Sequence, residues 1–239
     1  MTQFIMETAK ILDGFWQKFT ADRIIPRDLS FTRPDKEALA LVSSRLKKKF
    51  EEIVGLGVGP LASIGVTPNA LTVMGLLAST ASAWAYLHWR IDRIYFIVAA
   101  SFILLSGILD AFDGILARKT GKVTKSGGFF DSVADRYSDA VVLGAIVISG
   151  LCDPIWGVSA LIGSLMVSYV RARSEAVGVA MIAVGFAERA ERMLLLVVAT
   201  LGAYYQIEFI GYGIIILAMI ANLTVVQRVA YFMNEVKTS

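Results

Sequence analysis

The chain has 239 residues, of which 56% are hydrophobic and only 18% charged, and its mean hydropathy is +0.65. A typical soluble domain carries about 25% charged residues, and a soluble protein of this size cannot bury so much apolar surface. One cysteine and one histidine exclude a disulfide framework and any metal site built from several Cys or His side chains. The net charge of +3 fits the basic flanks of membrane helices rather than binding of nucleic acid. Composition therefore predicts an integral membrane protein.

Two segments precede the most apolar part of the chain. Residues 1–36 mix apolar, charged and proline residues and are expected to form an N-terminal extension to which no motif assigns a role. Residues 37–66 have apolar residues at helical spacing, a basic cluster at 45–49 and a glycine-rich end. This pattern predicts an amphipathic helix on an anionic membrane surface, followed by a hinge, with a soluble amphipathic helix as the alternative. Residues 67–235 are expected to form the membrane domain.

Six hydrophobic segments follow the helix-start signal Thr67-Pro68-Asn69. A membrane-spanning helix needs roughly 20 residues, which each segment provides, the fifth only marginally. The predicted fold is an all-α integral membrane protein with six transmembrane helices, preceded by an amphipathic juxtamembrane helix. The segments cover about 70–88, 94–117, 128–151, 154–177, 189–205 and 209–234.

The basic residues predict how these segments cross the membrane. Of the 23 Lys and Arg residues, only Arg90 and Arg93 lie between the first two segments. The connections from the third to the fourth and from the fifth to the sixth segment carry none. Since cytoplasmic loops are enriched in Lys and Arg, both termini are expected in the cytoplasm of a multi-pass protein of the cell membrane.

Five aspartates within 30 residues interrupt the second and third segments. Gly107, Asp110, Gly114 and Ala117 share one helical stripe, which Asp113 flanks. The next segment has a second stripe of three aspartates at i, i+4 and i+8. The short connection predicts antiparallel neighbouring helices whose stripes face each other. Charged residues are costly in a membrane helix, so these aspartates indicate a functional site at the cytoplasmic end. The second stripe consists of Asp131, Asp135 and Asp139.

Converging carboxylates repel each other, and a divalent cation removes this conflict. Ligands that are all oxygen favour Mg²⁺, Mn²⁺ or Ca²⁺ over softer metals. One alternative is buried ion pairing with Arg118 and Arg136, but two arginines leave five aspartates with excess negative charge. A cation carrier would distribute its acidic residues through the membrane depth, and a non-catalytic scaffold would leave the cluster without a role. Their gathering near one membrane face favours a catalytic cavity.

These residues resemble the signature of the CDP-alcohol phosphotransferase family, D-x2-D-G-x2-A-R-x8-G-x3-D-x3-D. The resemblance covers roughly residues 45–235. It implies a six-helix membrane enzyme, commonly a homodimer, that moves a substituted phosphate from a CDP-linked donor to an alcohol and releases CMP. Every fixed position is filled, by Asp110, Asp113, Gly114, Ala117, Arg118, Gly127, Asp131 and Asp135.

The resemblance also implies roles for individual residues. Asp110, Asp113 and Asp131 would bind Mg²⁺ or Mn²⁺. Asp135 would be both a metal ligand and the general base on the acceptor hydroxyl. The CDP-lipid site would comprise Asn69, Thr72, Gly114, Ala117, Arg118 and Gly127.

Basic residues on the same membrane side indicate an acceptor that is itself anionic. The planar guanidinium fork of arginine donates paired hydrogen bonds to phosphate. Ordinary flanking charge is the alternative, with Arg171–Glu175 and Glu188–Arg192 as i,i+4 helix pairs. The candidates for binding the acceptor phosphate are Lys125, Arg171, Arg173, Arg189 and Arg192.

The stretches SYVRARSEAVG and GFAERAER resemble the phosphatidylinositol phosphate synthase branch of the family and its archaeal counterpart. The resemblance implies transfer of a lipid phosphate to myo-inositol 1-phosphate, with membrane lipids and a CDP-linked lipid as partners. No motif distinguishes CDP-diacylglycerol from CDP-archaeol. A synthase that uses glycerol 3-phosphate is the alternative, because it also needs an anion pocket.

Overall fold

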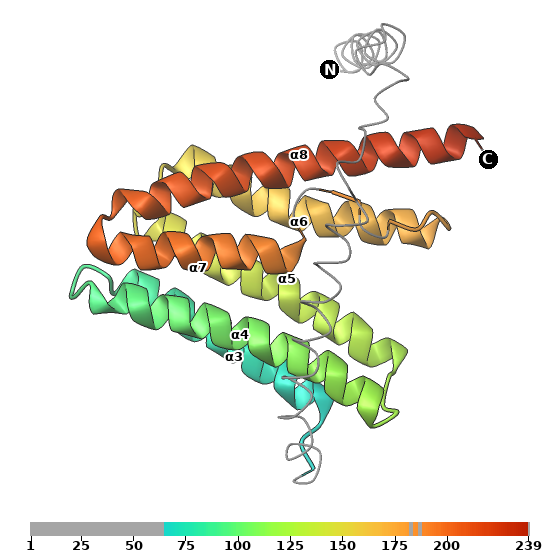
Figure 1. Cartoon of the computed structure of the whole chain (residues 1–239), viewed down its shortest axis with the longest axis horizontal. Coiled ribbons are helices and arrows are strands. Elements are labelled where there is room, and N and C mark those ends of the chain that lie inside the picture. The colour runs from blue at the N-terminus through green and yellow to red at the C-terminus, as the bar shows by residue number, and fades with distance from the viewer. Residues whose placement is uncertain (1–64, 182–183, 186–187, 239) are drawn as a thin grey trace, which may run out of the picture. The chain divides into compact units, whose positions relative to one another are not determined.

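The computed structural model describes residues 65–181, 184–185 and 188–238 (Figure 1). The chain divides into two units, Met1–Glu52 and Ile53–Ser239, and every described residue belongs to the second. The predicted N-terminal extension and the predicted amphipathic surface helix lie outside the described residues.

The described part is built from helices, with no strand among its residues. Every end of the six predicted segments agrees with a helix end to within four residues. The helices are α3 (Pro68–Leu87), α4 (Ile94–Lys119), α5 (Lys125–Ile148), α6 (Pro154–Ala176), α7 (Arg189–Tyr205) and α8 (Glu208–Thr238).

Four of these helices, α3, α4, α6 and α8, are long and apolar enough to cross a membrane. The other two fall short of the prediction of six spans for different reasons. Helix α5 carries three aspartates and Arg136 within its first two thirds, and α7 has only 17 residues. At about 1.5 Å per residue, a helix of that length is shorter than the roughly 30 Å of hydrocarbon in a bilayer.

Side chains before three of the helices account for where they begin. Thr67 and Thr124 cap α3 and α5, their side chains accepting hydrogen bonds from backbone N–H groups of the first turn. Asp153 caps α6 in the same way. Pro68 and Pro154 occupy the first position of their helices, where the missing N–H has no intrahelical partner to lose.

The six helices pack as a closed ring. The closely packed pairs are α3–α4, α4–α7, α7–α8, α8–α6, α6–α5 and α5–α3. Figure 1 shows α3 running beside α4, and α6 beside α8. Helices α4 and α5, predicted as antiparallel neighbours, are not among these pairs, because α3 packs against both. The two aspartate-bearing helices therefore approach each other at the site without packing along their lengths.

Polar side chains, most of them hydroxylated, join the helices inside the ring. The hydroxyls of Ser79 on α3 and Ser106 on α4 are hydrogen-bonded at 2.8 Å. Tyr86 on α3 is likewise hydrogen-bonded to Thr200 on α7. The Asn222 amide on α8 donates to the Ser159 carbonyl on α6 at 3.1 Å. Such contacts are typical of membrane helices, which associate through close packing and hydrogen bonds rather than through exclusion of water.

Hydrogen bonds from side chains to backbone carbonyls hold three of the connections together at one end of the ring. The Trp89 indole donates to the Ser149 carbonyl at 3.2 Å, and the Arg93 guanidinium donates to the Tyr205 carbonyl at 3.1 Å. These residues belong to the α3–α4, α5–α6 and α7–α8 connections or their helix ends. The aspartates lie near the α4–α5 connection at the opposite end of their helices.

Two glycines of α8 provide a test of this packing. A Cβ at Gly213 would lie 2.3 Å from the Cβ of Ala199 on α7, whereas the nearest atom to a Cβ at Gly211 is the Leu151 carbonyl oxygen at 3.9 Å. Gly213→Ala is expected to force α7 and α8 apart and to destabilise the protein by about 1–3 kcal/mol. Gly211→Ala is the control and should be neutral or slightly stabilising. Thermal unfolding in detergent checks both, and equal midpoints would contradict the α7–α8 contact.

Candidate active site

Three carboxylates from two helices converge at one end of the ring. One oxygen each from Asp110 and Asp113 of α4 and from Asp131 of α5 lie within 4.8 Å of one another. Asp113 is buried, and the other two are half-buried. The ligands of one divalent ion lie at most about 4–5 Å apart, so the three carboxylates are spaced for a shared cation.

Helix α3 fixes the most buried of these carboxylates. Thr72 is itself buried, and its hydroxyl donates to Asp113 Oδ2 at 2.7 Å. The same hydroxyl lies 3.2 Å from the Pro68 carbonyl oxygen. Because α3 packs against both α4 and α5, this hydrogen bond ties the carboxylate group to the helix between them.

The residues around this group fit a divalent metal ion. They enclose a cavity of about 10 Å³, here called the carboxylate cavity, which is close to the volume that one water-sized particle needs. Within it, Asp131 Oδ1 is buried and has no hydrogen-bond partner among the described residues. A carboxylate oxygen in that position lacks a positive partner, and an oxygen-only donor set is what Mg²⁺ and Mn²⁺ prefer.

Asp135 lies beside the group rather than within it. It lines the carboxylate cavity but is not one of the three closely spaced carboxylates. Its Oδ1 is 2.7 Å from Arg189 NH1, an ion pair between α5 and α7. The same Arg189 nitrogen lies 3.3 Å from Asp110 Oδ2. The aspartates thus form ion pairs with Arg189, which was not one of the two arginines of the ion-pairing alternative. Of those two, Arg136 donates to the Ser132 carbonyl one turn earlier.

The residues expected to bind the CDP-lipid lie at the ends of α3, α4 and α5. Asn69 and Gly127 are adjacent, since a Cβ at Gly127 would lie 3.4 Å from Asn69 Oδ1. A Cβ at Gly114 would lie 3.4 Å from Arg118 NH1, so those two are adjacent on α4. Thr72 contacts Asp113 directly, as described above. Ala117 is half-buried on α4, one residue before Arg118.

A larger cavity of about 200 Å³, here called the arginine cavity, adjoins the carboxylates between α5, α6, α7 and α8. Five arginines contribute to its wall. Arg171 also forms an exposed ion pair with Glu175 at 2.9 Å, as the helix-pair alternative predicts. Of the candidates for binding the acceptor phosphate, Lys125 and Arg173 are exposed and are not among the lining residues. The wall consists of Asp135, Arg136, Val167, Ser168, Arg171, Glu188, Arg189, Ala190, Arg192 and Arg228.

Arg228 is a member of this wall that sequence reasoning missed. Only 3% of its surface is exposed, and its guanidinium donates to the carbonyls of Val184 and Val167 at 2.8 and 2.7 Å. It thereby joins the α6–α7 connection and α6 to α8. It lies inside the predicted sixth segment, and an arginine within an apolar span is itself a signal of function.

The two cavities share a boundary. Asp135 and Arg189 are the two residues that line both. An anion held by the arginines would therefore lie next to the carboxylates. This arrangement suits chemistry in which a metal-bound phosphate group reacts with a second, anionic molecule.

Comparison with known proteins identifies the family to which the chain belongs. The family model described as CDP-alcohol phosphatidyltransferase matches residues 65–226. The chain therefore belongs to the CDP-alcohol phosphatidyltransferase family, which is a family of membrane enzymes.

Individual members of this family and their structures are similar to the chain over most of its length. An archaetidylinositol phosphate synthase from Pyrococcus horikoshii is 42% identical over 172 residues, which cover 71% of this chain and 85% of the relative. One from Methanothermobacter thermautotrophicus is 33% identical over 198 residues, 82% of this chain and 98% of the relative. The crystal structure of Mycobacterium tuberculosis phosphatidylinositol phosphate synthase with CDP-DAG bound matches with a TM-score of 0.66 and 26% identity, covering 76% of this chain and 94% of that one. A structure of the same enzyme with manganese and citrate also has a TM-score of 0.66, at 26% identity over 75% of this chain and 88% of that one.

The hydrogen bond from Thr72 to Asp113 predicts an effect on metal affinity. Thr72→Val keeps the shape of the side chain but removes the donor that orients the carboxylate. Mn²⁺ affinity, measured by electron paramagnetic resonance on the purified protein, is expected to fall about 10- to 100-fold. Thr80→Val is the matched control, since the Thr80 hydroxyl donates to the Leu76 carbonyl on the exposed side of the same helix. Equal affinities in the two variants would show that Thr72 does not support the metal site.

Proposed function

We propose that this enzyme transfers the lipid-phosphate group of a CDP-linked lipid to the hydroxyl of myo-inositol 1-phosphate and releases CMP. The observation that carries the proposal is the shared boundary of the two cavities, where a metal-binding carboxylate group meets an arginine-lined wall. The relatives named archaetidylinositol phosphate synthase and phosphatidylinositol phosphate synthase support the same acceptor.

The donor is assigned to the carboxylate side. Asp110, Asp113 and Asp131 would hold Mg²⁺ or Mn²⁺, with Asp135 as a fourth ligand. A divalent ion held there would supply positive charge to the pyrophosphate oxygens and to CMP as the leaving group. The manganese in one related structure and the CDP-DAG in another support a divalent ion and a CDP-linked lipid as ligands. The CDP moiety would contact Asn69, Thr72, Gly114, Ala117, Arg118 and Gly127.

The acceptor is assigned to the arginine cavity. Its phosphate would be bound by Arg171, Arg189, Arg192 and Arg228, whose planar forks suit a phosphate group. A cavity of about 200 Å³ accommodates a sugar-sized phosphate, and its neutral lining residues Ser168 and Ala190 leave room for hydroxyl groups. Lys125 and Arg173 would act at the rim.

Bond changes follow from this placement. The acceptor hydroxyl oxygen attacks the lipid-linked phosphorus, a new phosphorus–oxygen bond forms, and the bond to the bridging oxygen of CMP breaks. Asp135 lies on the boundary between the cavities and takes the hydroxyl proton as that bond forms. In-line phosphoryl transfer depends mainly on positioning and electrostatics, so a weak base held in place suffices.

The membrane arrangement is part of the same proposal. All six helices cross the bilayer, and both termini and the active site face the cytoplasm. Residues 67–235 form the catalytic domain, 37–66 a surface helix and hinge, and 1–36 an extension. The functional unit is a homodimer.

Release of CMP by the purified protein tests the reaction. With Mg²⁺ and either CDP-diacylglycerol or CDP-archaeol, release is expected with inositol 1-phosphate and not with free inositol or serine, and Asp135→Asn should abolish it. A preference for glycerol 3-phosphate would keep the chemistry but refute the acceptor. No release with any acceptor or donor would refute the transferase and turn attention to cation transport by the same aspartates.

Two arginines two positions apart on α6 test the acceptor cavity. Arg171 lines it and Arg173 does not. Arg171→Gln is expected to raise the KM for inositol 1-phosphate about tenfold, because a charged hydrogen bond to the phosphate is lost. Arg173→Gln should change it less than threefold, a bound set from the weak effect of exposed charges. Steady-state kinetics of both variants measure these KM values. A larger increase in Arg173→Gln than in Arg171→Gln would show that the phosphate does not bind in the arginine cavity.

A further inference from the structure

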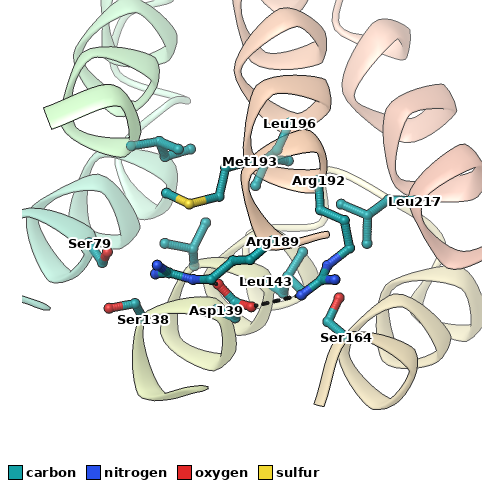
Figure 2. A pocket seen from close by; sticks show the side chains of 12 residues that line it. Ser79, Ser138, Asp139, Leu143, Ser164, Arg189, Arg192, Met193, Leu196 and Leu217 are labelled. Atoms are coloured by element: carbon teal, nitrogen blue, oxygen red, sulfur yellow. Dashed lines mark hydrogen bonds and ion pairs between the residues drawn. The ribbon is translucent and has the colours of Figure 1, made fainter. Parts of the chain in front are cut away.

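Asp139 lines neither of the two cavities, and yet its carboxylate contacts two of the arginines. Asp139 lies one helical turn beyond Asp135 on α5 and is outside the family signature. It is absent from the described walls of both the carboxylate cavity and the arginine cavity. Instead it lines a third, interior cavity of about 30 Å³ at the centre of the ring, to which all six helices contribute (Figure 2).

Figure 2 shows Asp139 between the side chains of Arg189 and Arg192. Its Oδ1 accepts a hydrogen bond from Arg189 Nε at 3.3 Å, and its Oδ2 lies 3.5 Å from Arg192 NH2. The side chains of Asp139, Arg189 and Arg192 are 16%, 18% and 5% exposed, respectively. Solvent therefore screens this group weakly.

The two buried arginine side chains need a negatively charged partner between them. Arg189 and Arg192 lie three residues apart in the first turn of α7, on one face of the helix, so their positive charges repel. Burying a charge without a partner of opposite sign is strongly unfavourable. Asp139 supplies one negative charge between the two and holds each by a different oxygen.

The geometry transmits this contact to the acceptor cavity. Both arginines line the arginine cavity, while Asp139 contacts them from the interior side. With Arg189 Nε held by Asp139, the opposite edge of the guanidinium reaches Asp135 at 2.7 Å. Asp139 thus fixes where two phosphate-binding groups stand relative to the general base, without touching either substrate.

We infer that Asp139 is a positioning residue for the acceptor phosphate, a role that rests on the function proposed above. Its loss weakens binding of the phosphorylated acceptor and leaves binding of the metal and of the CDP-lipid intact. Asp139→Glu keeps the charge with a longer side chain and restores part of the acceptor affinity.

Steady-state kinetics of the full-length protein in detergent test this role. Asp139→Asn is expected to raise the KM for inositol 1-phosphate and the inhibition constant of inorganic phosphate by about tenfold or more, because hydrogen bonds between charged groups are lost. The KM for the CDP-lipid, kcat and Mn²⁺ affinity should stay within threefold, and Asp139→Glu should lie between Asp139→Asn and the wild type. Asp153 caps the start of α6, at the other end of the ring from the active site. Asp153→Asn is therefore the matched control and should resemble the wild type.

Several results would overturn the inference. A fall in kcat with an unchanged acceptor KM, a similar change in the KM of both substrates, or a loss of Mn²⁺ affinity would assign Asp139 a structural or metal-binding role. If Asp139→Asn does not fold, Asp139→Glu alone carries the test, and an unchanged acceptor KM in it is the contradicting result.

The acceptor preference of the wild type is recorded in the same assay and separates the two proposals. A preference for glycerol 3-phosphate refutes the proposed function, and the ratio of variant to wild-type KM for that phosphate still judges Asp139. Use of an acceptor without a phosphate refutes both.

Discussion

Mutual repulsion among the carboxylates of Asp110, Asp113 and Asp131 is the constraint on which the rest of the site depends. Their oxygens gather within 4.8 Å at one end of a ring of largely apolar helices. Such a group is costly unless positive charge is supplied. The protein supplies part of it through Arg189, and the donor set and the unpartnered Asp131 oxygen fit a divalent ion for the remainder.

The ring packing explains how the charges are brought together. Helix α3 contributes no carboxylate, yet it packs against both α4 and α5 and donates the Thr72 hydrogen bond to Asp113. Helix α7 is too short to be a typical span, but its first turn carries the two arginines that face α5. Arg228 on α8 then ties the α6–α7 connection to the same wall. Helices α3, α7 and α8 thus each contribute a side chain that orients or neutralises a group on another helix.

Much of this was predictable because the signals are local. A run of about 20 apolar residues predicts a membrane helix whatever surrounds it, so the helix bounds agreed closely. The spacing of Asp110, Asp113, Asp131 and Asp135 predicted a common site for the same reason. The order of helices around the ring has no local signal in the sequence. The short α4–α5 connection predicted that these helices pack together, but α3 packs against both of them. The partners of Asp139 and the burial of Arg228 likewise depend on α7 and α8, distant in sequence, and no spacing rule contains them.

The central claim is that a metal ion bound by the aspartates lies next to an anion bound by the arginines. Diffraction from crystals grown with Mn²⁺ and inositol 1-phosphate, with data collected at the manganese absorption edge, tests it most directly. The account predicts an anomalous peak within about 2.0–2.5 Å of oxygens of Asp110, Asp113 and Asp131, and phosphate density against Arg189 and Arg192. A peak outside the carboxylate cavity, or phosphate bound away from the arginine cavity, would contradict it.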